Sequence, residues 1–133
     1  MRRKIERLER IERLRKRLHE LSAWRLAVAT QEREKLTTAH GEMIAALGEG
    51  LMAYGPASAA GARRVRAIER ELAVADVIEK DLERRTLDDG RLAKLADRYL
   101  ATARGEWREG QDRRSLEELI EATVAADPAS RKP

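Results

Sequence analysis

Two histidines are the residues of this sequence best suited to metal binding or proton transfer. Neither His19 nor His40 belongs to an HExxH or HxH pattern, and neither has acidic residues at ligand spacing. The chain contains no Cys, which excludes disulfides and thiolate metal ligands. We therefore predict that both histidines lie on helix surfaces and that the protein uses no metal and no cofactor.

The sequence contains no pattern typical of a catalytic serine or of a phosphate-binding loop. The serines have no base and acid at the spacings that activate a nucleophile. Gly48-Glu49-Gly50 lacks the strand and helix context of a phosphate loop. The carboxylates alternate with Arg and Lys, as they do on solvated helices. We predict that the protein is not an enzyme.

The composition favours long, solvated helices over a thick core. Charged residues make up 39% of the chain and aromatic residues 3%, and Phe is absent. Apolar residues between 5 and 51 recur at steps of three and four, as on one face of a helix. Successive steps of three rotate this stripe around the helix, so we expect a coiled coil of irregular register.

A cluster of small residues interrupts the helical pattern near the middle of the chain. Gly55-Pro56 is its strongest stop signal, because proline lacks an N–H and restricts the residue before it. We predict an all-α fold with two long helices forming an antiparallel coiled-coil hairpin. One domain spans 1–126, with helix 1 over about 2–51, a turn over about 52–62 and helix 2 over about 63–126; residues 127–133 form a frayed tail.

A turn centred near residue 57 predicts which residues face each other. Trp24 falls near Gly90, where a large ring would pack over a residue without a side chain. Trp107 falls near residues 7–10. Packing of Trp24 on Gly90 would favour a helix 2 that is continuous at Gly90. A break at Gly90, which would give three helices, stays open as an alternative.

Both termini fall at the open end of this hairpin. Residues 1–17 hold nine Lys or Arg and three Glu, a net charge of +6 in a chain of net charge +4. Met1 falls opposite residue 113, so the part of helix 2 after residue 113 has no partner on helix 1. Its apolar residues Leu116, Leu119 and Ile120 occupy one face of the helix. Such a stripe indicates partner contact.

Two alternatives concern these ends. Ser115 and Glu118 have the spacing of a capping box that would start a new helix, but the continuous stripe favours one uninterrupted helix. The basic start can be a solvated face with pairs such as Glu9–Arg13. It can also bind nucleic acid or an anionic membrane surface, although the interleaved glutamates oppose phosphate binding.

Two segments resemble the flagellar export family FliJ and the related YscO-type proteins of virulence secretion systems. The opening KIERLERIERLRKRLHELSAWRLAVATQEREKL (4–36) is similar to the basic first helix of that family. The closing segment is similar to a family pattern in which Gln111 precedes Leu116-Glu117-Glu118-Leu119, with Glu117 where Asp is usual. Together these segments cover about half of the chain.

The resemblance implies a non-enzymatic coiled coil of a bacterial type III export apparatus, similar to a rotary-ATPase stalk. Its expected partners are the export ATPase hexamer, the export gate and export chaperones, and no nucleic acid. We expect a cytoplasmic protein that can lie at the periphery of the inner membrane, because no apolar run approaches the ~20 residues of a membrane span. A homo-oligomeric structural coiled coil stays open as an alternative, although the irregular register and the self-complementary hairpin favour a monomer. The residues expected to face the ATPase are Arg7, Arg10, Arg13, Gln111, Arg113, Arg114, Leu116, Glu118, Leu119 and Ile120.

Overall fold

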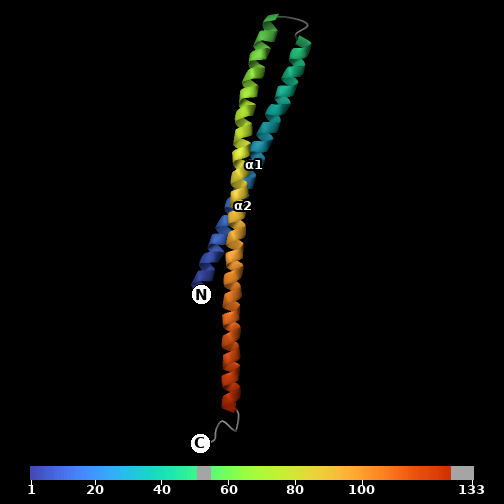
Figure 1. Cartoon of the computed structure of the whole chain (residues 1–133). Coiled ribbons are helices and arrows are strands. Elements are labelled where there is room, and N and C mark those ends of the chain that lie inside the picture. Colours follow the sequence, from blue (N-terminus) through green and yellow to red (C-terminus); the bar gives the residue numbers. More distant parts are fainter. Residues whose placement is uncertain (51–54, 127–133) are drawn as a thin grey trace. The chain divides into compact units, whose positions relative to one another are not determined.

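The fold consists of two long helices. A computed structural model describes residues 1–50 and 55–126, with α1 spanning Arg2–Gly50 and α2 spanning Gly55–Ala126 (Figure 1). No strand occurs within these ranges. The predicted all-α fold of two long helices is confirmed. The predicted residues 52–54 of the turn, Leu51 and the predicted tail 127–133 lie outside the described residues.

The chain divides into two compact units. The hairpin unit comprises Lys16–Arg91, and the terminal unit comprises Met1–Arg15 with Leu92–Pro133. Each helix contributes to both units. The single domain expected over 1–126 stays a prediction, and the units are described separately below.

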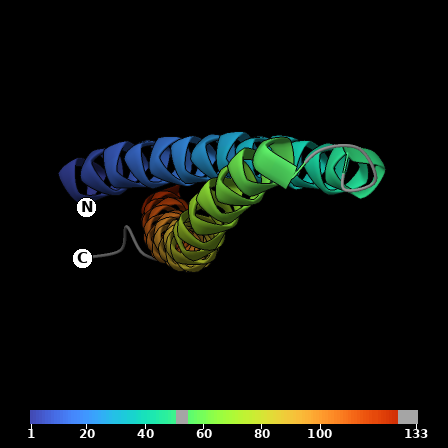
Figure 2. The ribbon, with the colours of Figure 1, turned by 90° about the horizontal axis from the view of Figure 1, so that it is seen from above.

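Contacts between α1 and α2 in the hairpin unit follow antiparallel order. Arg33 Nε lies 2.5 Å from Glu79 Oε2, and His40 Nε2 lies 3.1 Å from Glu69 Oε1. As the residue number rises along α1, the number of its partner falls along α2. Figure 2 shows the two helical ribbons from above.

Helix α2 is continuous across its interior glycines. It passes through Gly90, Gly105 and Gly110 without a break, and no described glycine has a positive φ. The three-helix alternative is therefore excluded. The capping-box alternative at Ser115 is excluded as well, because that residue lies inside the same helix.

The facing register differs from the prediction because α2 starts earlier than expected. It begins at Gly55, where Pro56 falls in the first turn and its missing N–H has no intrahelical partner to lose. The midpoint between the helices therefore lies before residue 57. Gly90 faces His19, not Trp24 as predicted, and Trp24 is 63% exposed.

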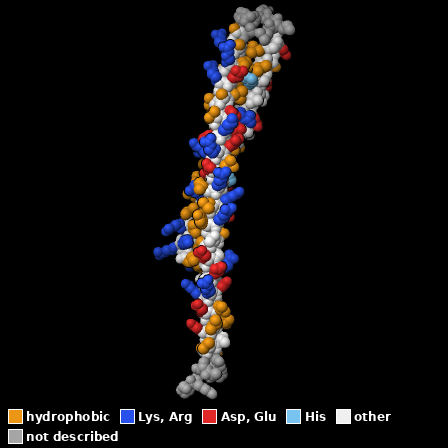
Figure 3. Space-filling model, viewed as in Figure 1, with side chains coloured by type: hydrophobic (Ala, Val, Ile, Leu, Met, Phe, Trp, Pro, Cys, Tyr) orange, Lys and Arg blue, Asp and Glu red, His pale blue; other side chains and the backbone are white. Residues whose placement is uncertain are grey.

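The core is thin, since two helices share only one line of contact. Within the described residues, the buried apolar side chains are Val65, Ala96, Leu100 and Ala103. Many large apolar side chains remain at the surface, and Figure 3 shows them between charged side chains along both helices. No described helix is both long enough and apolar enough to cross a membrane.

Candidate functional site

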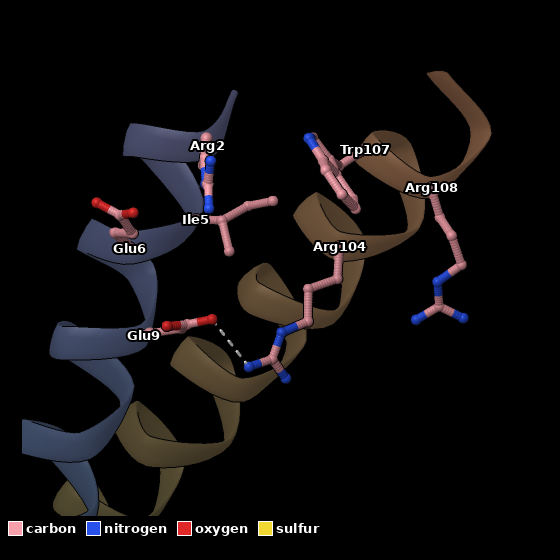
Figure 4. A pocket seen from close by; sticks show the side chains of 7 residues that line it. All are labelled: Arg2, Ile5, Glu6, Glu9, Arg104, Trp107 and Arg108. Carbon is pink, nitrogen blue, oxygen red and sulfur yellow. Dashed lines mark hydrogen bonds and ion pairs between the residues drawn. The ribbon is translucent and has the colours of Figure 1, made fainter. Parts of the chain in front are cut away.

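The first turns of α1 and residues 104–108 of α2 form a cavity in the terminal unit. This terminal pocket has a volume of about 430 Å³ and is lined by Arg2, Ile5, Glu6, Glu9, Arg104, Trp107 and Arg108. Figure 4 shows the side chain of Ile5 directed from α1 toward α2, on the side where the Trp107 ring lies. The pocket thus combines an apolar wall with a charged rim.

The rim of the terminal pocket carries an excess of positive charge. Arg104 Nη2 lies 3.2 Å from Glu9 Oε1, so these two charges compensate each other (Figure 4). Neither Arg2 nor Arg108 forms an ion pair within the described residues, and Glu6 is the remaining acid. An aromatic ring beside free guanidinium groups is suited to contact with an acidic partner segment.

The pairing of Glu9 corrects one sequence expectation. Its carboxylate accepts a hydrogen bond from Arg104 on α2, and no Glu9–Arg13 pair forms. The Glu9 carboxylate therefore contributes to the contact between the helices and not to a pair along α1. The reason is geometric, because Glu9 is only half-exposed and faces the opposite helix.

The first turn of α1 is basic where a helix favours acids. Arg2, Arg3 and Lys4 are exposed, and no acidic residue lies in this turn. The helix macrodipole places partial positive charge at the N-terminus, so the three cations destabilise the turn. An anionic partner would remove this repulsion.

Residues 112–126 of α2 form an overhanging segment, in which every residue is exposed. The exposed fractions are 57% for Leu116, 62% for Leu119 and 53% for Ile120. These three side chains share one helix face. The last turn of α2 contains no basic residue, so nothing in it compensates the negative end of the macrodipole.

The ten residues predicted to face a partner all belong to the terminal unit. Nine are exposed and Gln111 is half-buried. None of the ten lines the terminal pocket. Among its lining residues, the sequence singled out Trp107, which was expected near residues 7–10, and Glu9, which was expected to pair with Arg13. A facing register shifted by about one turn would have placed Trp107 beside Ile5 and Arg2. The partner-binding role of the ten residues stays a prediction.

Ser22, His19 and His40 lie in the hairpin unit, and their side chains face α2. The Ser22 hydroxyl contacts the Asp89 carboxylate and the Leu18 carbonyl. The two histidines are half-buried and face α2, and the contact between His40 and Glu69 is open to solvent, so their place on the helix surface stays a prediction. No group of three or more potential metal ligands occurs among the described residues.

The Arg33–Glu79 ion pair joins the two helices, with 2.5 Å between Arg33 Nε and Glu79 Oε2. The hydrogen bond to the Glu79 carboxylate raises the pKa of Arg33 above its ordinary value, and the charge of Glu79 adds to the shift. A guanidinium is charged at all working pH values. Arg33 is therefore suited to hold α1 and α2 together and not to transfer a proton.

No family model, no curated protein and no solved structure matches the chain.

Proposed function

We propose that this protein is a non-enzymatic coiled-coil component of a bacterial type III export apparatus that binds the export ATPase ring. The observation that carries the proposal is the composition of the terminal unit. The basic start of α1 and the apolar stripe of the overhanging segment belong to the same compact unit. A charged end with a single projecting helix is suited to entry into a protein ring.

The energetics of the two helix ends support an external partner. The first turn of α1 and the last turns of α2 both carry charges that their macrodipoles disfavour. The stripe of Leu116, Leu119 and Ile120 adds apolar surface that the described chain leaves exposed. A partner that supplies anionic groups to α1 and an apolar groove to α2 would satisfy both ends.

The resemblance to the FliJ and YscO-type proteins implies that this partner is the export ATPase hexamer. It also suggests contact with the export gate and with export chaperones, which would place the protein at the inner membrane without a membrane-spanning helix. The protein would then act by promoting ring assembly and ATP hydrolysis. No group of its own takes part in the reaction.

Reconstitution with the cognate export ATPase tests the proposal. We expect the full chain to increase ATP hydrolysis and ring formation, and substitution of Leu116, Leu119 and Ile120 by Ser to abolish both effects. Val77→Ser is the matched control, because Val77 is 67% exposed but belongs to the hairpin unit. An intact chain that leaves the ATPase unchanged would contradict the proposal.

A second candidate function is favoured by the exposure of Arg2, Arg3 and Lys4. These cations could bind duplex DNA or anionic vesicles, and such binding would weaken steeply with salt. Titration of the chain with either ligand at two salt concentrations distinguishes this function. Strong, salt-sensitive binding that disappears in Arg3→Glu, Lys4→Glu would favour it over ATPase binding.

A further inference from the structure

Most of the polar groups that the terminal pocket leaves free are hydrogen-bond donors. The Glu9 carboxylate already accepts a hydrogen bond from Arg104. Within the described residues, the side chains of Arg2, Trp107 and Arg108 form no hydrogen bond and no ion pair. Guanidinium and indole groups donate hydrogen bonds and cannot accept them. A ligand of this pocket must therefore supply acceptor oxygens.

Glu6 is the one acid of the lining that has no partner within the described residues. In Figure 4 its carboxylate lies on the far side of α1 from Trp107, whereas Ile5 is directed toward α2. The lining as a whole contains three arginines and two glutamates, and so carries a net charge of +1. That balance suits a single carboxylate, because both glutamates would repel a polyphosphate.

An apolar wall lies beside these donors. The half-buried Ile5 and the Trp107 ring come from different helices and line the same cavity, whose volume is about 430 Å³. The Trp107 side chain is 39% exposed, so part of its ring still faces water. An apolar group placed between Ile5 and Trp107 would remove apolar surface of both from water. The ligand should therefore carry an apolar group next to its carboxylate.

The terminal pocket is too open to enclose a small molecule. Sites for small ligands bury roughly 70–90% of the ligand surface. Here two helices supply all of the walls, and five of the seven lining residues are exposed. Such a pocket can cover one side chain while the backbone that carries this side chain continues in solvent. A peptide segment with an apolar residue beside an acidic residue has this form.

We propose that the terminal pocket binds an acidic peptide segment of a partner protein. An apolar side chain of the segment lies between Ile5 and Trp107, and the neighbouring carboxylate accepts hydrogen bonds from the Arg2 guanidinium. Arg108, on the other side of the ring from Ile5, attracts the segment where it leaves the pocket (Figure 4). The carboxylate also reduces the repulsion between the basic first turn of α1 and its macrodipole.

The fluorescence of Trp107 tests the proposal without the export ATPase, so its failure would leave the export function untouched. The chain has two Trp, and Trp24→Phe leaves Trp107 as the single indole. Trp24 is 63% exposed and belongs to the hairpin unit, so this change does not reach the pocket. The probe is the tetrapeptide Gly-Leu-Glu-Gly with acetyl and amide ends. We expect a saturable change in emission, and its absence up to about 10 mM peptide would overturn the proposal.

Two altered peptides test the chemistry of recognition. Gln in place of Glu removes the charge and keeps the shape, whereas Gly in place of Leu removes the apolar group. Each altered peptide should bind about fivefold or more weakly than the parent peptide. Equal affinity of the Gln peptide would overturn the assignment of a carboxylate. Tighter binding of adenosine monophosphate than of the parent peptide would overturn the proposal in favour of a nucleotide site.

A matched pair of variants separates the pocket from the general positive charge of the first turn. Arg2→Gln and Lys4→Gln each remove one exposed cation from this turn, but only Arg2 lines the pocket. In the Trp24→Phe background, Arg2→Gln should weaken the peptide by about fivefold, and Lys4→Gln by no more than about twofold. Equal losses would show that the turn attracts the peptide through its charge alone, and would overturn the pocket assignment. Circular dichroism confirms that each variant keeps its helices.

Discussion

Gly61 and Gly105 of α2 differ in whether a side chain at their position would contact α1. A methyl group at position 61 would lie 2.5 Å from Leu47 Cδ2, whereas one at position 105 would meet nothing within 4 Å. Both glycines lie inside α2. The same substitution therefore has two different consequences on one helix.

We predict that Gly105→Ala raises the free energy of unfolding by about 1 kcal/mol, the helix-propensity difference. Gly61→Ala gains the same propensity but forces Leu47 to move, at a cost of about 1–3 kcal/mol, so the variant should be neutral or destabilised. Denaturant unfolding followed by circular dichroism measures both. In a Leu47→Ala background the penalty at position 61 should disappear. Equal stabilisation by the two alanines in the parent chain would contradict this assignment.

The sequence predicted least well which residues of α1 face which residues of α2. The pairing of Trp24 with Gly90 assumed a turn centred near 57, and the earlier start of α2 brings His19 to Gly90 instead. A shift of one turn exchanges every facing pair without changing the apolar stripes. Periodicity alone cannot detect such a shift, because it repeats every turn.

The two helices themselves follow from the sequence. Apolar spacing and the absence of internal Pro predicted both elements, and α2 remains helical through three glycines that each cost about 1 kcal/mol. The terminal pocket could not be derived in the same way. It depends on Trp107 meeting Ile5 across the two helices, and therefore on the register.

Within α2, the part that packs against α1 differs from the overhanging segment in the burial of its apolar side chains. Leu100 is 3% exposed and Leu119 is 62% exposed, although both lie on the same helix of the terminal unit. We predict that Leu100→Ala lowers the free energy of unfolding by about 2–3 kcal/mol, toward the low end for buried leucine because the core is thin.

The equivalent change in the overhang should be nearly silent. Leu119→Ala should alter the free energy of unfolding by no more than about 0.5 kcal/mol, since the side chain is already in water. The denaturation midpoint of each variant, followed by circular dichroism, measures the two changes. A loss at Leu119 as large as that at Leu100 would mean that the overhang packs against its own chain.

At the scale of the whole molecule, two partner contacts are assigned to one compact unit. The stripe of Leu116, Leu119 and Ile120 is proposed to contact the export ATPase, and the terminal pocket is proposed to bind an acidic peptide segment. Both surfaces belong to the terminal unit, and they share no residue. A single partner can therefore contact both at once, and the second contact then gains from the effective concentration that the first one creates.

We predict that the acidic segment belongs to the export ATPase, so that the Gly-Leu-Glu-Gly peptide competes for part of the contact. Saturating peptide should lower the affinity of the chain for the ATPase by about fivefold or more, and Arg2→Gln should do the same. The Leu116, Leu119 and Ile120 serine variant should lose ATPase binding but bind the peptide like the parent chain. Sedimentation with a labelled chain at fixed concentration and increasing ATPase, with and without peptide, measures this directly. If the ATPase bound equally tightly in the presence of peptide, the acidic segment would belong to a different partner.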